Sequence, residues 1–181
     1  MLAQAEMILR NIAESMFIVG AIGKDNSFAE KYVLSEEISR KKALIRLKDH
    51  SERNCEQVDK ETLDLIAELD DKIKSEEIKK FTTEQIAQIA ELADYYDTLY
   101  PLTSMAIHTS ARGLDKSLQV DDEGKVHAIH YEPATDEIEM HLDYGISMML
   151  YTLHEIATYF GKDTEIIEKL QRKNNETAIK A

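Results

Sequence analysis

The chain has 181 residues, carries a formal net charge of −13 and contains only two prolines, six glycines and one cysteine. Hydrophobic residues at 43% and charged residues at 31% exclude a disordered polypeptide, and the length fits a single globular domain over residues 1–181 with a polar tail from about residue 174. The acidic excess disfavours general affinity for nucleic acid, which needs cationic contacts to phosphate, and the lone Cys55 excludes an intramolecular disulfide and fits a reducing cytoplasm.

Residues 3–22 are predicted to form the first helix. Leu9, Ile12 and Met16 recur at helical spacing on one face, with charged and polar residues opposite. After Met16, apolar residues fill the opposite face as well, a pattern typical of a helix that is surrounded by the rest of the fold. We therefore expect this helix to be central.

The next helix is predicted to run from Ser27 to about Asn54. Ser27 and Glu30 have the spacing of a capping box, in which each side chain bonds the backbone N–H of the other residue. Ser35, followed by two glutamates, predicts that the helix restarts there after a bend.

Two more helices are predicted before the centre of the chain. Asp59 is expected to cap the third helix, and the capping-box pair Thr82 and Gln85 is expected to start the fourth. Pro101 suits the first turn of a further helix and disfavours helical geometry at Tyr100, so a kink or break is expected there.

The last third of the chain begins with a segment unlike the rest. Residues 118–133 place an acidic turn between two short runs of β-forming residues and predict a hairpin or an ordered loop. Thr135 or Asp136 is expected to cap a long helix that ends at Gly161, before a terminal helix. The apolar side of the long helix carries Ile138, Leu142, Ile146, Met149, Leu150, Leu153, Ala157 and Phe160. The predicted fold is an all-α bundle of six to seven helices with one short hairpin or ordered loop.

The centre of the sequence carries the strongest candidate for chemistry. Ser104, His108 and Arg112 follow one another at intervals of four residues and so share one face of a helix. His108 is suited to proton transfer near neutral pH, and Arg112 is suited to binding a phosphate. The alternative is a polar helix face in water, which needs no function. Both hypotheses stay open from the sequence.

Arg10 and Glu14 form a second candidate pair, one turn apart on the first helix. If that helix is central, their charges must compensate each other, because an unpaired buried charge is costly. A structural ion pair meets this requirement. The functional alternative is a catalytic site in which Arg10 and Glu14 converge with Tyr100 and His108.

A metal centre has weaker support. His127, His130 and His141 suggest one, but residues three apart on a strand point to opposite faces, and zinc needs three or four converging ligands. The Glu-x-x-His motif of di-iron bundles does not occur in the sequence. We therefore predict no metal centre, and the sequence identifies no cofactor.

A local basic strip stands out against the acidic remainder of the chain. It lies in the second predicted helix and contains Arg40, Lys41, Lys42 and Arg46. A solvated helix face explains such a strip, and a surface for nucleotide or nucleic acid is the alternative. The apolar run at residues 15–23 is shorter than the ~20 residues that a membrane-spanning helix needs, so no membrane span is expected.

The motif around Tyr100 resembles the signature of an uncharacterised bacterial all-helical family. The resemblance rests on Tyr100, Thr103, Ser104, Ile107, His108 and Ser110, on the Arg10-Asn-Ile-Ala-Glu14 helix, and on the closing Tyr159-Phe160-Gly161. That family has no assigned activity. Its helical plan is similar to the HEPN group of bacterial nucleases and nucleotide-binding proteins. HEPN ribonucleases have four to six residues between an arginine and the following histidine. No arginine here has that spacing, since only three residues separate Arg46 from His50, which argues against ribonuclease activity.

Two functions follow as hypotheses. The first is a nucleotide- or nucleic-acid-binding or -processing helical protein, as the resemblance implies. The second is a non-catalytic protein-interaction module, expected to be a homodimer through an apolar helix face. Whether the protein is an enzyme stays open between them.

Overall fold

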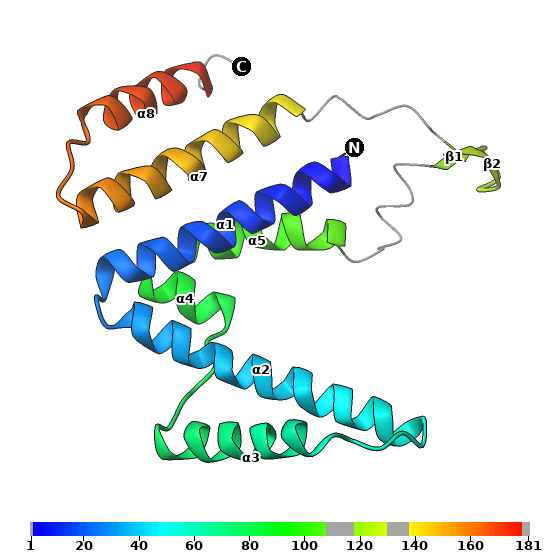
Figure 1. Cartoon of the computed structure of the whole chain (residues 1–181). Helices are drawn as coiled ribbons and strands as arrows, with labels where there is room; N and C mark the ends of the chain where they lie inside the picture. Colours follow the sequence, from blue (N-terminus) through cyan, green and yellow to red (C-terminus); the bar gives the residue numbers. More distant parts are fainter. Residues whose placement is uncertain (1, 108–117, 130–137, 179–181) are drawn as a thin grey trace. The chain divides into compact units, whose positions relative to one another are not determined.

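The computed structural model describes residues 2–107, 118–129 and 138–178. Within these ranges, side chains are described except at residues 2–3, 99, 102–107 and 177–178. Seven helices and one two-stranded hairpin make up the described part of the chain (Figure 1). The prediction of an all-α fold with one short hairpin is confirmed. None of the helices in the described ranges is long and apolar enough to cross a membrane.

The first of two compact units comprises Met1–Lys24 and Ile86–Ala181. Its central element is α1 (Leu2–Lys24), which packs against both α5 (Ala93–Ile107) and α7 (Ile138–Tyr159). The buried side chains come from all three helices and include Leu9, Ala13, Met16, Phe17 and Ala21 of α1, Tyr100 of α5 and Met148 of α7. The first helix is therefore central to this unit, as its all-round apolar second half predicts.

Two glycines allow close approach between α1 and its neighbours. A Cβ added at Gly20 would lie 3.0 Å from the Ala90 Cβ, and a Cβ added at Gly145 in α7 would lie 3.3 Å from Leu9 Cδ2. Both distances are shorter than an ordinary van der Waals contact between carbon atoms. The missing side chains therefore set how closely these segments pack.

The short helix α4 (Thr83–Ile89) begins as the sequence predicts. The Gln85 N–H donates to Thr82 Oγ1 at 3.2 Å, and the Thr82 N–H donates to Gln85 Oε1 at 3.0 Å. This reciprocal pair is a capping box, so the predicted start of the fourth helix is confirmed.

The break between α4 and α5 comes earlier than predicted. It lies at Glu91, whose φ of 60° is left-handed, and Tyr100 and Pro101 both lie inside α5. The chain is therefore not broken at Tyr100, and the alternative of a kink there stays a prediction. Contacts of Tyr100 with α1 hold it in the helix against the local preference for extended backbone before a proline. Because Pro101 is exposed, water can bond the carbonyl that its missing N–H leaves without a helical partner.

The hairpin lies within the predicted segment. β1 (Leu118–Val120) pairs in antiparallel register with β2 (Val126–Ile129). Asp121 Oδ1 accepts from the Lys125 N–H at 2.8 Å, and Gly124 takes a φ of 80° that favours glycine. The acidic turn residue and the glycine together close the connection.

The last two described helices are antiparallel to each other. Gly161, at a φ of 62°, terminates α7 as predicted, and α8 (Glu165–Ala178) packs back onto α7 (Figure 1). The α8 helix continues past residue 174, and the polar tail from about residue 174 stays a prediction. The predicted caps Thr135 and Asp136 lie outside the described residues.

The second compact unit, Asp25–Gln85, contains α2 (Phe28–Arg53). This helix starts at the predicted place, but Ser27 makes no side-chain capping bond and its hydroxyl donates to Asp25 instead. The predicted capping box is therefore wrong. The predicted bend at Ser35 is also wrong, because α2 is continuous and the buried Ser35 hydroxyl donates to the Tyr32 carbonyl within it.

The partner of α2 in this unit is α3 (Lys60–Ser75). Asp59 caps α3 as predicted, accepting from the Glu61 N–H at 2.8 Å and the Thr62 N–H at 3.3 Å. The acidic N-terminal turn of α3 is therefore placed by a side chain that the sequence identifies.

Ion pairs connect α2 to α3. Lys41 pairs with Asp70, and Lys72 Nζ lies 3.0 Å from Glu37 Oε1. Lys74 also pairs with Asp70, at 2.5 Å within α3. Hydrogen bonds from Lys41 and then from Lys74 lower the pKa of Asp70 from 3.8 to about 2. Charged side chains therefore bridge these two helices, beside the buried Leu69 of α3.

Candidate functional site

Three of the predicted site residues come together between α1 and α5. Arg10 Nε donates to Glu14 Oε1 at 2.9 Å, and Arg10 Nη2 donates to the Tyr100 hydroxyl at 2.6 Å. The Tyr100 hydroxyl donates in turn to Glu14 Oε1 at 2.9 Å. These side chains form a closed set of hydrogen bonds, which we call the Arg10–Glu14–Tyr100 triangle. It joins the opening helix to the centre of the chain.

Neighbouring side chains fix the Tyr100 ring. The ring stacks on Tyr96 with 4.9 Å between centroids and tilts against Phe17 at 6.4 Å. The guanidinium carbon of Arg10 lies 4.7 Å from the ring centroid, within the range of a cation–π contact. Tyr100 is buried, whereas the Glu14 side chain is 37% exposed. The triangle therefore meets solvent at its carboxylate.

The triangle is balanced in charge. Burial is the largest single influence on the Arg10 pKa and lowers it, but the hydrogen bond to Glu14 and the electrostatic interactions with Tyr100 and Glu14 raise the pKa of Arg10 above its ordinary value. Arg10 therefore stays cationic across the physiological range and offsets the carboxylate of Glu14. Such an arrangement can orient a hydroxyl or a carboxylate. A purely structural role also accounts for every hydrogen bond described in the triangle.

A second pair lies farther toward the start of α1, and the sequence did not reveal it. His141 Nε2 of α7 is 3.8 Å from Glu6 Oε1, with His141 buried and Glu6 half-buried. Glu6 stands four residues before Arg10, so the i, i+4 row of Glu6, Arg10 and Glu14 was the available signal. Which helix each member would face could not be read from that row. The row reaches α7 at one end and α5 at the other.

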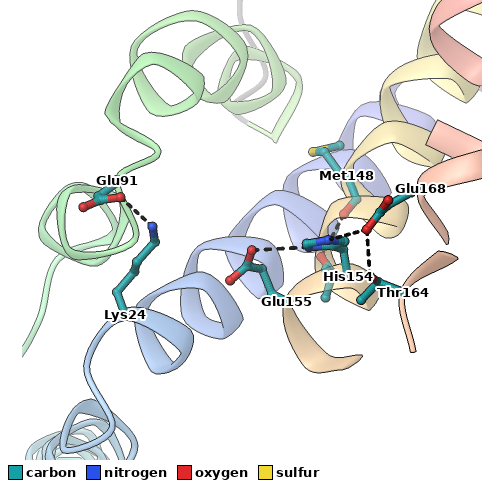
Figure 2. A network of polar contacts seen from close by, with 8 residues as sticks. Lys24, Glu91, Met148, His154, Glu155, Thr164 and Glu168 are labelled. Carbon is teal, nitrogen blue, oxygen red and sulfur yellow. Dashed lines mark hydrogen bonds and ion pairs between the residues drawn. The ribbon is translucent and has the colours of Figure 1, made fainter. Parts of the chain in front are cut away.

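Polar contacts also hold α8 against α7, as Figure 2 shows. His154 of α7 lies between two carboxylates, 3.8 Å from Glu155 and 3.9 Å from Glu168 of α8. Glu168 accepts from the Thr164 hydroxyl at 2.7 Å. Farther along, Asn174 of α8 donates to Ser147 Oγ at 2.8 Å. Polar groups of α8 thus contact one side of α7, the side on which Leu150 is buried.

The side of α7 that is left uncovered is apolar. Six side chains in a row are between 39% and 67% exposed: Leu142, Ile146, Met149, Leu153, Ile156 and Phe160. We call this row the α7 seam. Its members follow at intervals of four, three, four, three and four residues, which is the spacing of a coiled-coil contact. Most of the face that the sequence marks as apolar is therefore the exposed face.

A different face of α7 packs in the first unit. His141, Gly145 and Met148 are buried on it, and Gly145 approaches Leu9 of α1. On a helical wheel this face is centred about 90° from the seam. The inward face therefore contains a histidine and a glycine, which hydrophobicity alone does not select as core positions.

Comparison with known protein families gives a match over residues 1–126 to a family of unknown function (DUF5677). The chain belongs to this family. The DUF5677 match runs from α1 through the turn of the hairpin and contains the whole Arg10–Glu14–Tyr100 triangle, whereas the α7 seam lies beyond it. The predicted resemblance to an uncharacterised family agrees with the match, and the HEPN-like plan stays a prediction. Neither the curated proteins nor the solved structures compared with the chain give a match.

The remaining predicted site residues lie inside the DUF5677 range but are not joined to the triangle by the described structure. Ser104 is in α5, one turn after Tyr100, and its side chain is among those not described. His108 and Arg112 lie outside the described residues. The convergence of Arg10, Glu14 and Tyr100 is therefore observed, and the participation of His108 stays a prediction.

The histidines considered as metal ligands are separate where the structure describes them. His127 is exposed in β2, and His141 is buried in α7 beside Glu6, while His130 falls outside the described residues. Across the described ranges, no group of three or more His, Cys, Asp or Glu side chains is placed to hold a metal ion.

The predicted basic strip of α2 is partly neutralised in this DUF5677 member. Arg40 lies 3.7 Å from Glu37, and Lys41 pairs with Asp70. A surface depression near the end of α2 is lined by Asp49, Glu52 and Arg53, a set with more negative than positive charge. These contacts weaken the case for an anionic ligand on α2, and nucleic-acid binding by the strip stays a prediction.

Proposed function

We propose that this member of the DUF5677 family is a non-catalytic protein-interaction module that forms a homodimer through the α7 seam. The observation that carries the proposal is the row of six large apolar side chains, each between 39% and 67% exposed. Scattered apolar residues are normal on a protein surface, but a continuous row at coiled-coil spacing is typical of a helix that packs against another helix.

The size of the seam suits a dimer. The exposed parts of its six side chains amount to roughly 600 Å² in one copy, by the area that large apolar side chains bury. Pairing two copies would remove on the order of 1,200 Å² from water, at the lower end of stable protein interfaces. Side chains beside the seam add to this area. The seam is therefore large enough for association without a further surface.

The distribution of charge permits a second copy as the occupant. The chain carries a net charge of −13, so two copies repel each other over most of their surfaces. Residues 144–153, in the middle of α7, contain no charged side chain. The centre of the seam is thus a place where two acidic chains can meet without burying like charges.

The Arg10–Glu14–Tyr100 triangle is compatible with this proposal as a structural element. Its guanidinium and carboxylate compensate each other, and its hydroxyl bridges them. Breaking such a set leaves a buried polar group with fewer partners, which costs stability. The triangle therefore explains how α5 is held on α1 without requiring a reaction.

Sedimentation velocity of the full chain tests the homodimer. We expect a mass of twice 20.7 kDa that falls toward 20.7 kDa on dilution. Leu153→Glu should give the monomer at every concentration while retaining the helical circular dichroism spectrum, because it buries a charge in the seam. Leu63→Glu, at an exposed apolar position of α3, is the matched control and should leave the dimer intact. A strictly monomeric wild-type chain would contradict the proposal.

A second candidate function is nucleotide or nucleic-acid processing. The observation that favours it is the triangle, because three residues predicted as one site do converge and their carboxylate reaches solvent. In this hypothesis His108 exchanges a proton with the substrate and Arg112 binds a phosphate. The resemblance to the HEPN group motivates the choice of substrate class.

Mutation of His108 tests the second candidate. His108→Ala should abolish turnover of RNA or nucleotide and leave the melting temperature nearly unchanged. His127→Ala, at an exposed histidine of β2, is the control and should retain turnover. Wild-type protein that turns over neither class of substrate, or an unfolded His108→Ala variant, would count against a catalytic role.

A further inference from the structure

We propose that the two copies pair antiparallel along α7, with the two-fold axis beside the middle of the seam, between Met149 and Leu153. This inference rests on the proposed homodimer and specifies which residues of the two copies meet. The spacing of the seam permits antiparallel pairing, and two further properties favour it over parallel pairing: the sizes of the side chains and the charges near the two ends.

The spacing of the seam reads the same in both directions. The intervals of four, three, four, three and four residues are symmetric about position 151. In an antiparallel two-fold pair, Leu142 of one copy therefore lies opposite Phe160 of the other. The same two-fold rotation places the inner seam residues of the two copies opposite one another. Every seam side chain therefore has a seam side chain across the interface.

Side-chain size also favours this direction. Antiparallel pairing combines the largest seam residue, Phe160, with the smaller Leu142 at both ends of the interface. Parallel pairing would put two Phe160 side chains together at one end and two Leu142 side chains at the other. Interfaces pack best when large and small residues alternate across facing positions, so the parallel pair would splay at one end or leave a gap at the other.

An acidic side chain lies near the start of the seam, and a basic side chain lies near its end, next to the exposed Asp163. Glu139 is exposed in the first turn of α7, and Lys162 is exposed directly after its last turn. Antiparallel pairing brings Glu139 of one copy to the same end as Lys162 of the other, whereas parallel pairing places Glu139 beside its own equivalent. Antiparallel helices also align their dipoles favourably. Such rim charges set orientation more than affinity.

Cysteine cross-linking of the full chain tests the direction. The exposed Cys55 is first replaced by serine, and Leu142→Cys and Phe160→Cys are then made separately in that background. With oxidised glutathione as the oxidant, we expect a disulfide-linked dimer when the two variants are mixed and none when either is oxidised alone. Ile146→Cys and Ile156→Cys form a second pair for the same experiment, in case Phe160→Cys weakens association.

The outcomes separate this inference from the homodimer itself. If Leu142→Cys links to itself and the mixture gives no extra product, the helices are parallel, and the inference fails while the homodimer stands. If sedimentation shows a dimer but neither cysteine pair links, both the direction and the seam as interface are wrong. If the parent protein is a monomer throughout, the inference and the proposed function fail together.

Charge exchange at the rim gives a readout that does not depend on oxidation. For an antiparallel dimer, Glu139→Lys should weaken association by roughly twofold to tenfold, because the introduced ammonium group then faces Lys162 of the other copy. Lys162→Glu should weaken it similarly, and the double exchange should restore it. In a parallel dimer, Glu139→Lys replaces one like-charged pair by another and leaves the dissociation constant unchanged, which would overturn the inference.

Discussion

The contacts of α1 in the first unit and the contact of α2 with α3 in the second unit hold helices together in different ways. Around α1 the contact is apolar and close, with buried aromatic and aliphatic side chains and two glycines at the tightest points. Between α2 and α3, ion pairs such as those of Asp70 cross the interface. The first kind of contact depends on volume, and the second depends on pH and salt.

The largest effect is expected from removing volume beside α1. Phe17 is fully buried, so Phe17→Ala should lower the free energy of unfolding by about 3–5 kcal/mol. Ile8→Ala, on the exposed face of the same helix, is the control and should change it by about 0.5 kcal/mol or less. Urea denaturation followed by circular dichroism measures both. Equal losses would show that the α1 contact is not governed by buried volume.

Adding volume at the two glycines of α1 should give opposite signs. A Cβ at Gly20 would meet the Ala90 Cβ at 3.0 Å, and both atoms are tied to backbone, so Gly20→Ala should destabilise by about 1–2 kcal/mol. A Cβ at Gly23 would meet only the tip of the Glu155 side chain, which can turn away. Gly23→Ala should therefore stabilise by up to about 1 kcal/mol through helix propensity. The same denaturation experiment compares the two, and loss of stability at both positions would contradict this account.

The triangle should contribute less than the apolar contacts. Tyr100→Phe keeps the buried ring but removes the hydroxyl between Arg10 and Glu14, which still bond each other. We expect a loss of about 1 kcal/mol in the free energy of unfolding. Tyr95→Phe, at an exposed position of the same helix, should change little. An unchanged stability in Tyr100→Phe would show that the hydroxyl is not structural and would strengthen a catalytic role.

The smallest effect is expected between α2 and α3. Ion pairs with Lys41 and Lys74 lower the pKa of Asp70 from 3.8 to about 2. A lowered pKa in the folded state means stabilisation that is present above pH 3.8 and is lost as the pH falls toward about 2. Asp70→Asn should therefore lower the melting temperature slightly at neutral pH, and the difference from wild type should shrink as the pH falls to 2. Asp64→Asn on the exposed face of α3 is the control, and a difference as large at pH 2 as at neutral pH would rule out this mechanism.

The elements of this fold could be predicted because their signals are local. Apolar spacing identified the helices, and Asp59 and the pair Thr82 and Gln85 marked two helix starts correctly. The break near Tyr100 was wrong because tertiary contacts outweighed the local effect of Pro101. Local preference and tertiary contact compete at such a position, and only the first can be read from the sequence.

The candidate site was predictable in part. A charged pair on a central helix required compensation, which pointed to Arg10 and Glu14, and Tyr100 joined them in the structure. The direction that α7 faces was not predictable, because an apolar stripe shows that a face is to be buried and not what buries it. Its inward face depends on Gly145, because the absence of a side chain there lets α7 approach Leu9 of α1 closely.

The neighbours Met148 and Met149 differ in solvent exposure, so their oxidation can report on the surface of α7. Met148 is 1% exposed, and Met149 is 54% exposed in the seam. Mild peroxide converts an accessible thioether to a sulfoxide and spares an enclosed one. Both methionines lie in one tryptic peptide, so Met148 is the internal reference for the oxidation of Met149. The ratio of the two sulfoxides reports whether the outer face of α7 is occupied, without any label or substitution.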